Sequence, residues 1–378
     1  MTSGSRLGRL AAIVPALVLA LLLPLLAACS GSPRAAHERP QLAQVAAITD
    51  TRVVAISLDG LNPKAITQLG RTRLPNLYRM LAEGAFTLNA RAQVEMTVTL
   101  PNHTSMVTGR RIDADHGGHG VTWNTDRAGT TVQQAAGHDV SSVFRAVHAA
   151  GGRTSLFSTK TKFSLFTRSW PAAVDRTVIR EEDDTALTTI FRQDIVANRR
   201  SFAFLHLGLA DQVGHASGWM STAYLNAVVR LDQLVGQVLA TIRGNTTLRR
   251  TTFVILTADH GGTPGTTGHD VATRYDNYRI PFVVWGRGVD HGNLYQLNPT
   301  YFRDPGMTRP LFTGVQPIRN GDLANLATRV LGLGPVPGSL WNKAQRLTWH
   351  EATRSHEEGP QAQSWPSSRS SASSMVPS

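Results

Sequence analysis

The sequence predicts an α/β fold with a mainly parallel central sheet that is flanked by helices. Short apolar runs without polar alternation predict strands that are buried on both faces. Segments with helical spacing separate these runs, and strands that alternate with helices are typical of parallel sheets. The chain has 378 residues, of which 41% are hydrophobic and 17% are charged. This composition is sufficient for a large core and excludes a wholly disordered chain.

The predicted elements follow one another along the chain. Strands are expected at Val53–Leu58, Thr154–Phe157, Phe202–Leu207, Phe253–Thr257 and Pro281–Trp285. Helices are expected at Leu74–Glu83, Asp139–Ala150, Ala186–Asn198, Tyr224–Ile242 and Asp322–Leu331. The first two helices are each followed by glycine, and the second opens on an Asp cap. Ligands bind at the carboxyl ends of the strands in such sheets, so the residues after each strand are expected to carry the chemistry.

The amino-terminal segment is interpreted as an export signal. Arg6 and Arg9 precede an apolar run that ends in Leu-Ala-Ala-Cys29, the order found in secretory signals. The end of this run resembles a bacterial lipobox, which implies cleavage before Cys29 and lipidation of its sulfur. An uncleaved membrane anchor is the alternative, and the two prolines in the run count against it. We therefore expect a protein that is lipid-anchored on the outer side of the bacterial cytoplasmic membrane.

This interpretation divides the chain into four parts. Residues 1–29 are the signal peptide, 30–50 a tether, 51–351 the folded domain and 352–378 a disordered tail rich in Ser and Pro. Cys29 is the only cysteine, which excludes an internal disulfide framework and a zinc site built on several thiolates.

The charge of the chain is strongly basic. It contains 38 Lys and Arg against 26 Asp and Glu, for a net charge of +12. No dense basic block and no nucleic-acid-binding motif is present, so we interpret the excess as arginine spread over a solvated surface. Only four of these residues are lysines: Lys64, Lys160, Lys162 and Lys343.

Aspartate and histidine follow three of the predicted strands. These residue types bind zinc and related divalent ions where thiolates are absent. Each pair is a weak signal alone, but three sets at one sheet edge predict a metal centre. The residues are Asp59 after the first strand, Asp211 and His215 after the third, and Asp259, His260 and His269 after the fourth.

A hydroxyl-rich segment adds a candidate nucleophile. Pro101 stands where a helix could begin, which places the Thr99 hydroxyl near the amino end of that helix. Helix amino ends favour phosphate oxygens. A threonine hydroxyl is a poor nucleophile unless its pKa is lowered, for which metal coordination suffices. A helix cap in a Thr-rich loop is the alternative.

Together these motifs resemble the alkaline phosphatase superfamily, and most closely its type I phosphodiesterase/nucleotide pyrophosphatase branch. The resemblance covers most of residues 51–335. It rests on Asp59, T-L-P-N-H at 99–103, D-x-x-G-H at 211–215, D-H-G-G at 259–262 and G-H-D at 268–270. It implies an alkaline-phosphatase-like fold.

The resemblance also implies a catalytic centre with two divalent ions. Asp211, His215 and His269 would hold one ion, with His291 as the competitor of His269. The other would be held by Asp59, Thr99, Asp259 and His260. Ligand type favours zinc, and manganese or a mixed site would suit the same side chains.

The implied chemistry is phosphoester hydrolysis through the Thr99 nucleophile. A covalent phospho-threonine intermediate would form, and Asn124 would bind a phosphoryl oxygen. Leu100 and His206 stand where nucleotide-cleaving relatives tend to carry aromatic residues, which weakens the case for nucleotides. These two residues and Trp123 are candidate substrate-pocket residues.

Other functions use the same residues. A phosphomonoesterase, a phosphonate hydrolase and an enzyme that transfers a phospho-headgroup to an envelope glycan would need the same site. A surface lipoprotein that binds metal or an anionic polymer is the non-enzymatic alternative. The substrate would be a phosphoester small molecule or an envelope-derived phosphoester. The remaining histidines, including His103, His116, His119 and His148, are expected at the surface or in support of the site.

Overall fold

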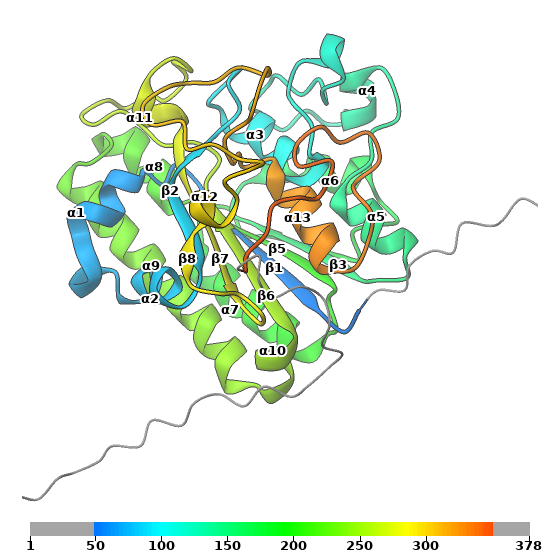
Figure 1. Ribbon diagram of the computed structural model, residues 1–378, viewed down its shortest axis with the longest axis horizontal. Coiled ribbons are helices and arrows are strands. Elements are labelled where there is room, and N and C mark those ends of the chain that lie inside the picture. The colour runs from blue at the N-terminus through cyan, green and yellow to red at the C-terminus, as the bar shows by residue number, and fades with distance from the viewer. Residues whose placement is uncertain (1–48, 351–378) are drawn as a thin grey trace, which may run out of the picture. The chain divides into compact units, whose positions relative to one another are not determined.

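An eight-stranded sheet forms the centre of the computed structural model, which describes residues 49–350 (Figure 1). Its strand order is β4-β3-β5-β1-β6-β7-β2-β8. The strands from β4 to β6 in this order run parallel, and β7 runs antiparallel to both β6 and β2. The strands are β1 (Arg52–Leu58), β2 (Ala85–Arg91), β3 (Thr154–Ser158), β4 (Arg176–Ile179), β5 (Phe202–Leu207), β6 (Thr252–Thr257), β7 (Arg279–Gly286) and β8 (Gly292–Asn293).

Helices cover both faces of this sheet. On one face α9 packs against α1, α2, α7 and α10, and on the other α13 packs against α3 and α5 (Figure 1). No helix in residues 49–350 is both long and apolar enough to cross a membrane. The helices are α1 (Pro63–Arg73), α2 (Pro75–Glu83), α3 (Thr99–Thr108), α4 (Val132–Ala136), α5 (Val143–Ala149), α6 (Ser164–Ser169), α7 (Asp184–Ala197), α8 (Leu209–Ser217), α9 (Thr222–Gly244), α10 (Thr246–Thr251), α11 (Tyr275–Tyr278), α12 (Leu294–Leu297) and α13 (Asp322–Val330), with 3-10 turns at Ala114–His116 and Thr161–Phe163.

The α/β prediction is confirmed, and all five predicted strands are present. β3, β5 and β6 are buried along their whole length, as continuous apolar runs predict. Three strands were not predicted, namely β2, β4 and β8. β4 and β8 lie at the two sheet edges and are only half-buried, so neither carries a long apolar run.

The start of one predicted helix is wrong. We expected a cap at Asp139, but α5 begins after Ser142, whose side chain accepts a hydrogen bond from the Arg145 backbone N–H. Asp139 instead pairs with the Arg145 guanidinium at 2.6 Å. The predicted signal peptide, the tether before Thr49 and the tail after residue 351 lie outside the described residues.

A buried carboxylate fastens the start of α2 to α9. Asp232 on α9 accepts hydrogen bonds from the Asn76 backbone and amide groups and from the Leu77 backbone at 2.7 Å. The N–H groups at a helix amino end have no partner within the helix. Asp232 therefore satisfies donors that α2 itself leaves open.

Replacing this carboxylate tests its contribution to stability. Asp232→Ala is expected to lower the free energy of unfolding by about 3 kcal/mol, because several buried donors lose a charged acceptor. Asp232→Asn keeps an acceptor oxygen and is expected to lose about half as much. Urea denaturation followed by circular dichroism measures both values, and equal losses in the two variants would contradict this account.

Candidate metal and phosphoester site

The topology of the sheet brings the predicted ligands together. β1 lies between β5 and β6, and all three strands are parallel, so their carboxyl ends meet at one edge. Asp59 directly follows β1, and Asp259 follows β6 after one residue. Asp211 lies in the first turn of α8, just after β5. The three carboxylates are therefore delivered by three neighbouring strands.

Two groups of ligand atoms result. One consists of Asp211, His260 and His269, and the other of Asp59, Asp259 and His260. Within each group the ligand atoms lie within 4.8 Å of one another, and all five residues are buried. The sequence assigned His260 to the second group alone, whereas the structure places it within reach of both.

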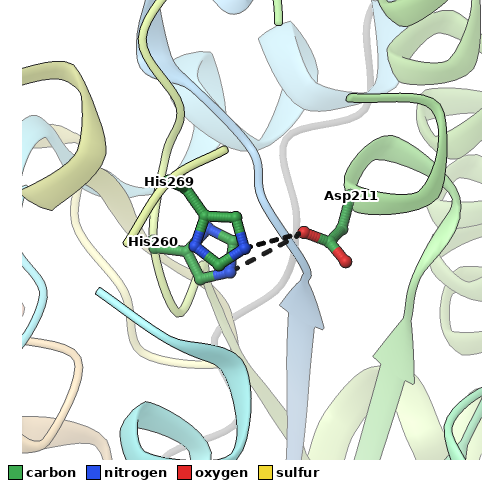
Figure 2. A group of neighbouring side chains, drawn as sticks. All are labelled: Asp211, His260 and His269. Carbon is green, nitrogen blue, oxygen red and sulfur yellow. Dashed lines mark ion pairs between the residues drawn. The ribbon is translucent and has the colours of Figure 1, made fainter. Parts of the chain in front are cut away.

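One oxygen of Asp211 is the meeting point of the first group. Figure 2 shows the stacked rings of His260 and His269 facing this oxygen. The two ring centroids lie 3.5 Å apart. The His269 Nε2 lies 3.6 Å and the His260 Nε2 3.8 Å from Asp211 Oδ1. His215 lies one helical turn after Asp211 on α8, and its Nε2 lies 3.4 Å from the same oxygen. The predicted ligands Asp211, His215 and His269 thus converge.

The competitor His291 does not belong to these groups. It is exposed and immediately precedes the edge strand β8. His269, by contrast, is buried, and its Nε2 lies 3.2 Å from His215 Nε2. The geometry therefore favours His269.

Glycines in two of the motifs make room for one tryptophan. A Cβ at Gly262 would lie 2.2 Å from the Trp219 ring, and a Cβ at Gly214 would lie 2.6 Å from it. Trp219 is fully buried, and its Nε1 donates to the Gly60 carbonyl at 3.0 Å. The Gly60 N–H in turn donates to Asp259 Oδ1 at 3.1 Å. The glycines therefore permit the packing that ties the three strand ends together.

The donor set fits divalent cations. Asp59 Oδ1, Asp211 Oδ1 and Asp259 Oδ2 are buried and have no hydrogen-bond partner within the described part of the chain. A buried carboxylate oxygen without a donor is costly unless a cation faces it. Carboxylate and imidazole are also the ligands that zinc takes where thiolates are absent. These residues are thus able to hold the ions that the resemblance implies.

The charges of the site are strongly coupled. Burial lowers the pKa of His260, but Asp259 and the other two carboxylates outweigh it and raise the pKa to about 9. Burial lowers the pKa of His269 to about 3. His269 is therefore a neutral imidazole at physiological pH, the form that binds metal.

Asp59 and Asp211 remain ionised despite their burial. Burial raises the pKa of Asp59, but the Lys160 ammonium and His206 hold it well below the ordinary value. For Asp211, burial and the charge of Asp59 raise the pKa, but Lys160, His215 and His260 together lower it below the ordinary value. The site is therefore a buried cluster of anions with a lysine against it.

Thr99 lies beside the second group. It is the first residue of α3, its side chain is buried, and its Oγ1 lies 3.5 Å from His260 Nε2. Asn124 Oδ1 accepts the N–H of Leu100 at 3.0 Å, next to Thr99 at the amino end of this helix. Lys162 Nζ donates to the same Asn124 oxygen at 3.1 Å. The hydroxyl, the helix end and Lys162 therefore occupy one region.

Two of the candidate pocket residues do not line an open pocket. The side chains of Leu100 and His206 are fully buried, and His206 Nε2 lies 2.9 Å from Asp59 Oδ2. Trp123 is partly buried, with the Arg127 guanidinium 4.5 Å from its ring centroid. An open cavity of about 350 Å³ lies elsewhere on the site, lined by Lys160, Lys162, Glu181, Glu182, Asp211, Gln212 and His215.

Among the other histidines, two support α3 from inside the protein. His103 and His119 are fully buried, and hydrogen bonds join them to Ser57 at 2.8 Å and Ser105 at 3.0 Å, respectively. His116 and His148 are exposed. Sequence reasoning missed Lys160 and Lys162 as site residues. The available signal was that two of the four lysines stand just after a predicted strand.

Comparison with known proteins identifies the family of this chain. The model of the type I phosphodiesterase / nucleotide pyrophosphatase family matches residues 53–303. The chain belongs to this family. The resemblance to the alkaline phosphatase superfamily is thereby confirmed.

Known structures with the same fold include a phosphodiesterase and a lipoteichoic acid synthase. Murine ectonucleotide pyrophosphatase / phosphodiesterase 5, solved in complex with AMP, superposes with a TM-score of 0.56 at 13% identity, over 79% of this chain and 100% of that one. The lipoteichoic acid synthase LtaP from Listeria monocytogenes superposes with a TM-score of 0.50 at 15% identity, over 76% of this chain and 73% of that one. These likenesses support the alkaline-phosphatase-like fold.

Among curated proteins, this chain matches short parts of two fungal transferases. GPI ethanolamine phosphate transferase 1 of Neurospora crassa is 42% identical over 96 residues, which is 24% of this chain and 9% of the transferase. Its counterpart in Chaetomium globosum is 34% identical over 121 residues, which is 31% of this chain and 12% of that protein. The match thus spans only about a tenth of each transferase.

A pair of histidine variants tests the assignment of the first group. His269→Gln is expected to weaken Zn²⁺ binding by at least about 100-fold, because a direct ligand is lost from a buried site. His291→Gln, the matched control, should bind Zn²⁺ like the unaltered protein. Isothermal titration calorimetry on metal-stripped protein measures both. The opposite pattern would show that His291 is the ligand.

Proposed function

We propose that this protein is an exported, metal-dependent phosphoester hydrolase of the phosphodiesterase type, with Thr99 as its nucleophile. One observation carries the proposal. Three carboxylate oxygens that have no hydrogen-bond partner among residues 49–350 converge with three histidines beside a threonine at a helix amino end. Membership of the phosphodiesterase family supports phosphoester chemistry.

Two sets of residues would hold the two divalent ions. Asp211, His215 and His269 suit one ion, and Asp59, Asp259, His260 and Thr99 suit the other. Bound divalent ions stabilise negative charge on phosphoryl oxygens and lower the pKa of nearby hydroxyl groups. We propose zinc because carboxylate and imidazole are ligands that it accepts.

The protein's own groups then orient and bind the substrate. The Thr99 oxygen attacks phosphorus and forms a covalent phospho-threonine, while the bond to the leaving alcohol breaks and that alcohol takes up a proton. Water then hydrolyses the phospho-threonine and restores the hydroxyl. Asn124, the amino end of α3 and Lys162 lie where they can bind the phosphoryl oxygens.

Two Thr99 variants test the nucleophile. Thr99→Ala is expected to lower kcat for a bis-aryl phosphate by more than about 10³-fold, because no attacking oxygen remains. Its metal content should stay near that of the unaltered protein, and Thr99→Ser should keep part of the activity. Phosphodiester turnover and metal analysis are measured on the same samples. Full activity of the alanine variant would remove Thr99 from the mechanism.

A transferase is the second candidate. The local identity with the ethanolamine phosphate transferases favours it, since attack on phospho-threonine by an alcohol in place of water would transfer the phosphoryl group. Turnover of a bis-aryl phosphate in the presence of glycerol distinguishes the two. Aryl phosphate alone indicates hydrolysis, and glyceryl aryl phosphate indicates transfer.

The location of the protein is also a proposal. We propose a lipid anchor at Cys29 on the outer side of the bacterial cytoplasmic membrane, on the strength of the lipobox-like end of the apolar run. Cells fed labelled palmitate should incorporate it into the unaltered chain and not into the Cys29→Ala variant. Equal labelling of both would overturn the proposal.

A further inference from the structure

Lys160 lies between the two metal groups. It follows β3, and its Nζ lies 2.6 Å from Asp59 Oδ2 and 2.6 Å from Asp211 Oδ2. Its side chain is 11% exposed, against 0% and 4% for the two carboxylates. Asp59 belongs to one group and Asp211 to the other. A single ammonium therefore contacts one carboxylate of each group.

The two oxygens of each carboxylate have different roles in this arrangement. Lys160 Nζ contacts the Oδ2 atom of both Asp59 and Asp211. The Asp59 Oδ2 atom also lies 2.9 Å from His206 Nε2. The Oδ1 atoms have no hydrogen-bond partner within residues 49–350. Figure 2 shows one Asp211 oxygen directed at the histidines and the other directed away from them. Each carboxylate is thus held by one oxygen and open at the other.

We propose that Lys160 is a positioning residue that holds Asp59 and Asp211 by their outer oxygens and keeps their inner oxygens directed at the two ion positions. This inference rests on the metal binding proposed above. A fixed cation offsets the repulsion between two buried carboxylates before any ion binds. The lysine would keep these contacts when ions are bound at the Oδ1 atoms, and it would then link the two halves of the site with and without metal.

The stability of a lysine variant reports this role without any activity measurement. Lys160→Met keeps the apolar stem and removes the charge. In metal-stripped protein the variant is expected to lower Tm by about 5 °C, because two buried carboxylates lose their shared cation. Saturating Zn²⁺ should close at least half of this gap, since the ions then supply the missing positive charge.

Lys162→Met is the matched control. Lys162 stands two residues away and donates to Asn124, not to a carboxylate oxygen. The Tm of the Lys162→Met variant should therefore respond to Zn²⁺ like the Tm of the unaltered protein. An equal decrease in the Tm of Lys160→Met with and without Zn²⁺ would show that Lys160 stabilises the fold without acting on the metal site. No loss in the metal-stripped state would show that it does not hold the carboxylates.

Failure of the metal proposal gives a different pattern. If Zn²⁺ does not raise the Tm of the unaltered protein, the proposed function fails. If it does, and Lys160→Met behaves like the control, only the role of Lys160 is overturned.

A second measurement needs no variant. Acetic anhydride labelling followed by mass spectrometry compares the four lysines in the unaltered protein. Lys160 should stay unmodified with and without Zn²⁺, whereas Lys64, with 43% of its side chain exposed, should react in both states. Rapid modification of Lys160 in either state would show that it has left the carboxylates.

Discussion

A buried cluster of negative charge is the constraint on which the site depends. Asp59, Asp211 and Asp259 are almost fully removed from water, and isolated carboxylates in such surroundings are costly. They tolerate burial only because cations face them. Lys160 and the protonated form of His260 supply part of that charge. One oxygen of each carboxylate has no hydrogen-bond partner in the described part of the chain, which indicates that further positive charge is expected there.

The sheet topology makes this concentration of charge possible. Because β5, β1 and β6 are adjacent and parallel, any side chains that follow them are brought to the same edge. The packing around Trp219 then locks the three strand ends together, and the glycines of two motifs leave space for its ring. Residues that contribute no ligand atom thus determine where the ligands point. The amino end of α3 adds a neutral donor surface next to the anionic cluster.

The parts of the structure that depend on residue type and periodicity were predictable. Val53–Leu58 and Phe202–Leu207 were predictable as strands because each is apolar at all but one position. An Asp shortly after such a strand indicates the active edge of the sheet. β4 and β8 were missed because edge strands need no apolar run. The cap at Asp139 was wrong because Ser142 offers the same hydrogen bond three residues later.

Within the site, the convergence of Asp211, His215 and His269 was predicted, and the contacts of single side chains were not. His206 and Leu100 were assigned by position in a motif, but burial depends on packing from distant segments. Lys160 was missed for a similar reason. Its place just after a predicted strand was a signal for the site, but its local sequence does not indicate that its ammonium reaches the carboxylates that follow two other strands.

The number of ions that the folded protein holds is the most direct test of this account. Native mass spectrometry of residues 30–378, after dialysis against Zn²⁺ and then against metal-free buffer, measures it. The account predicts two ions per chain in the unaltered protein. A chain that retains no ion would contradict the central claim that these buried carboxylates form a metal centre.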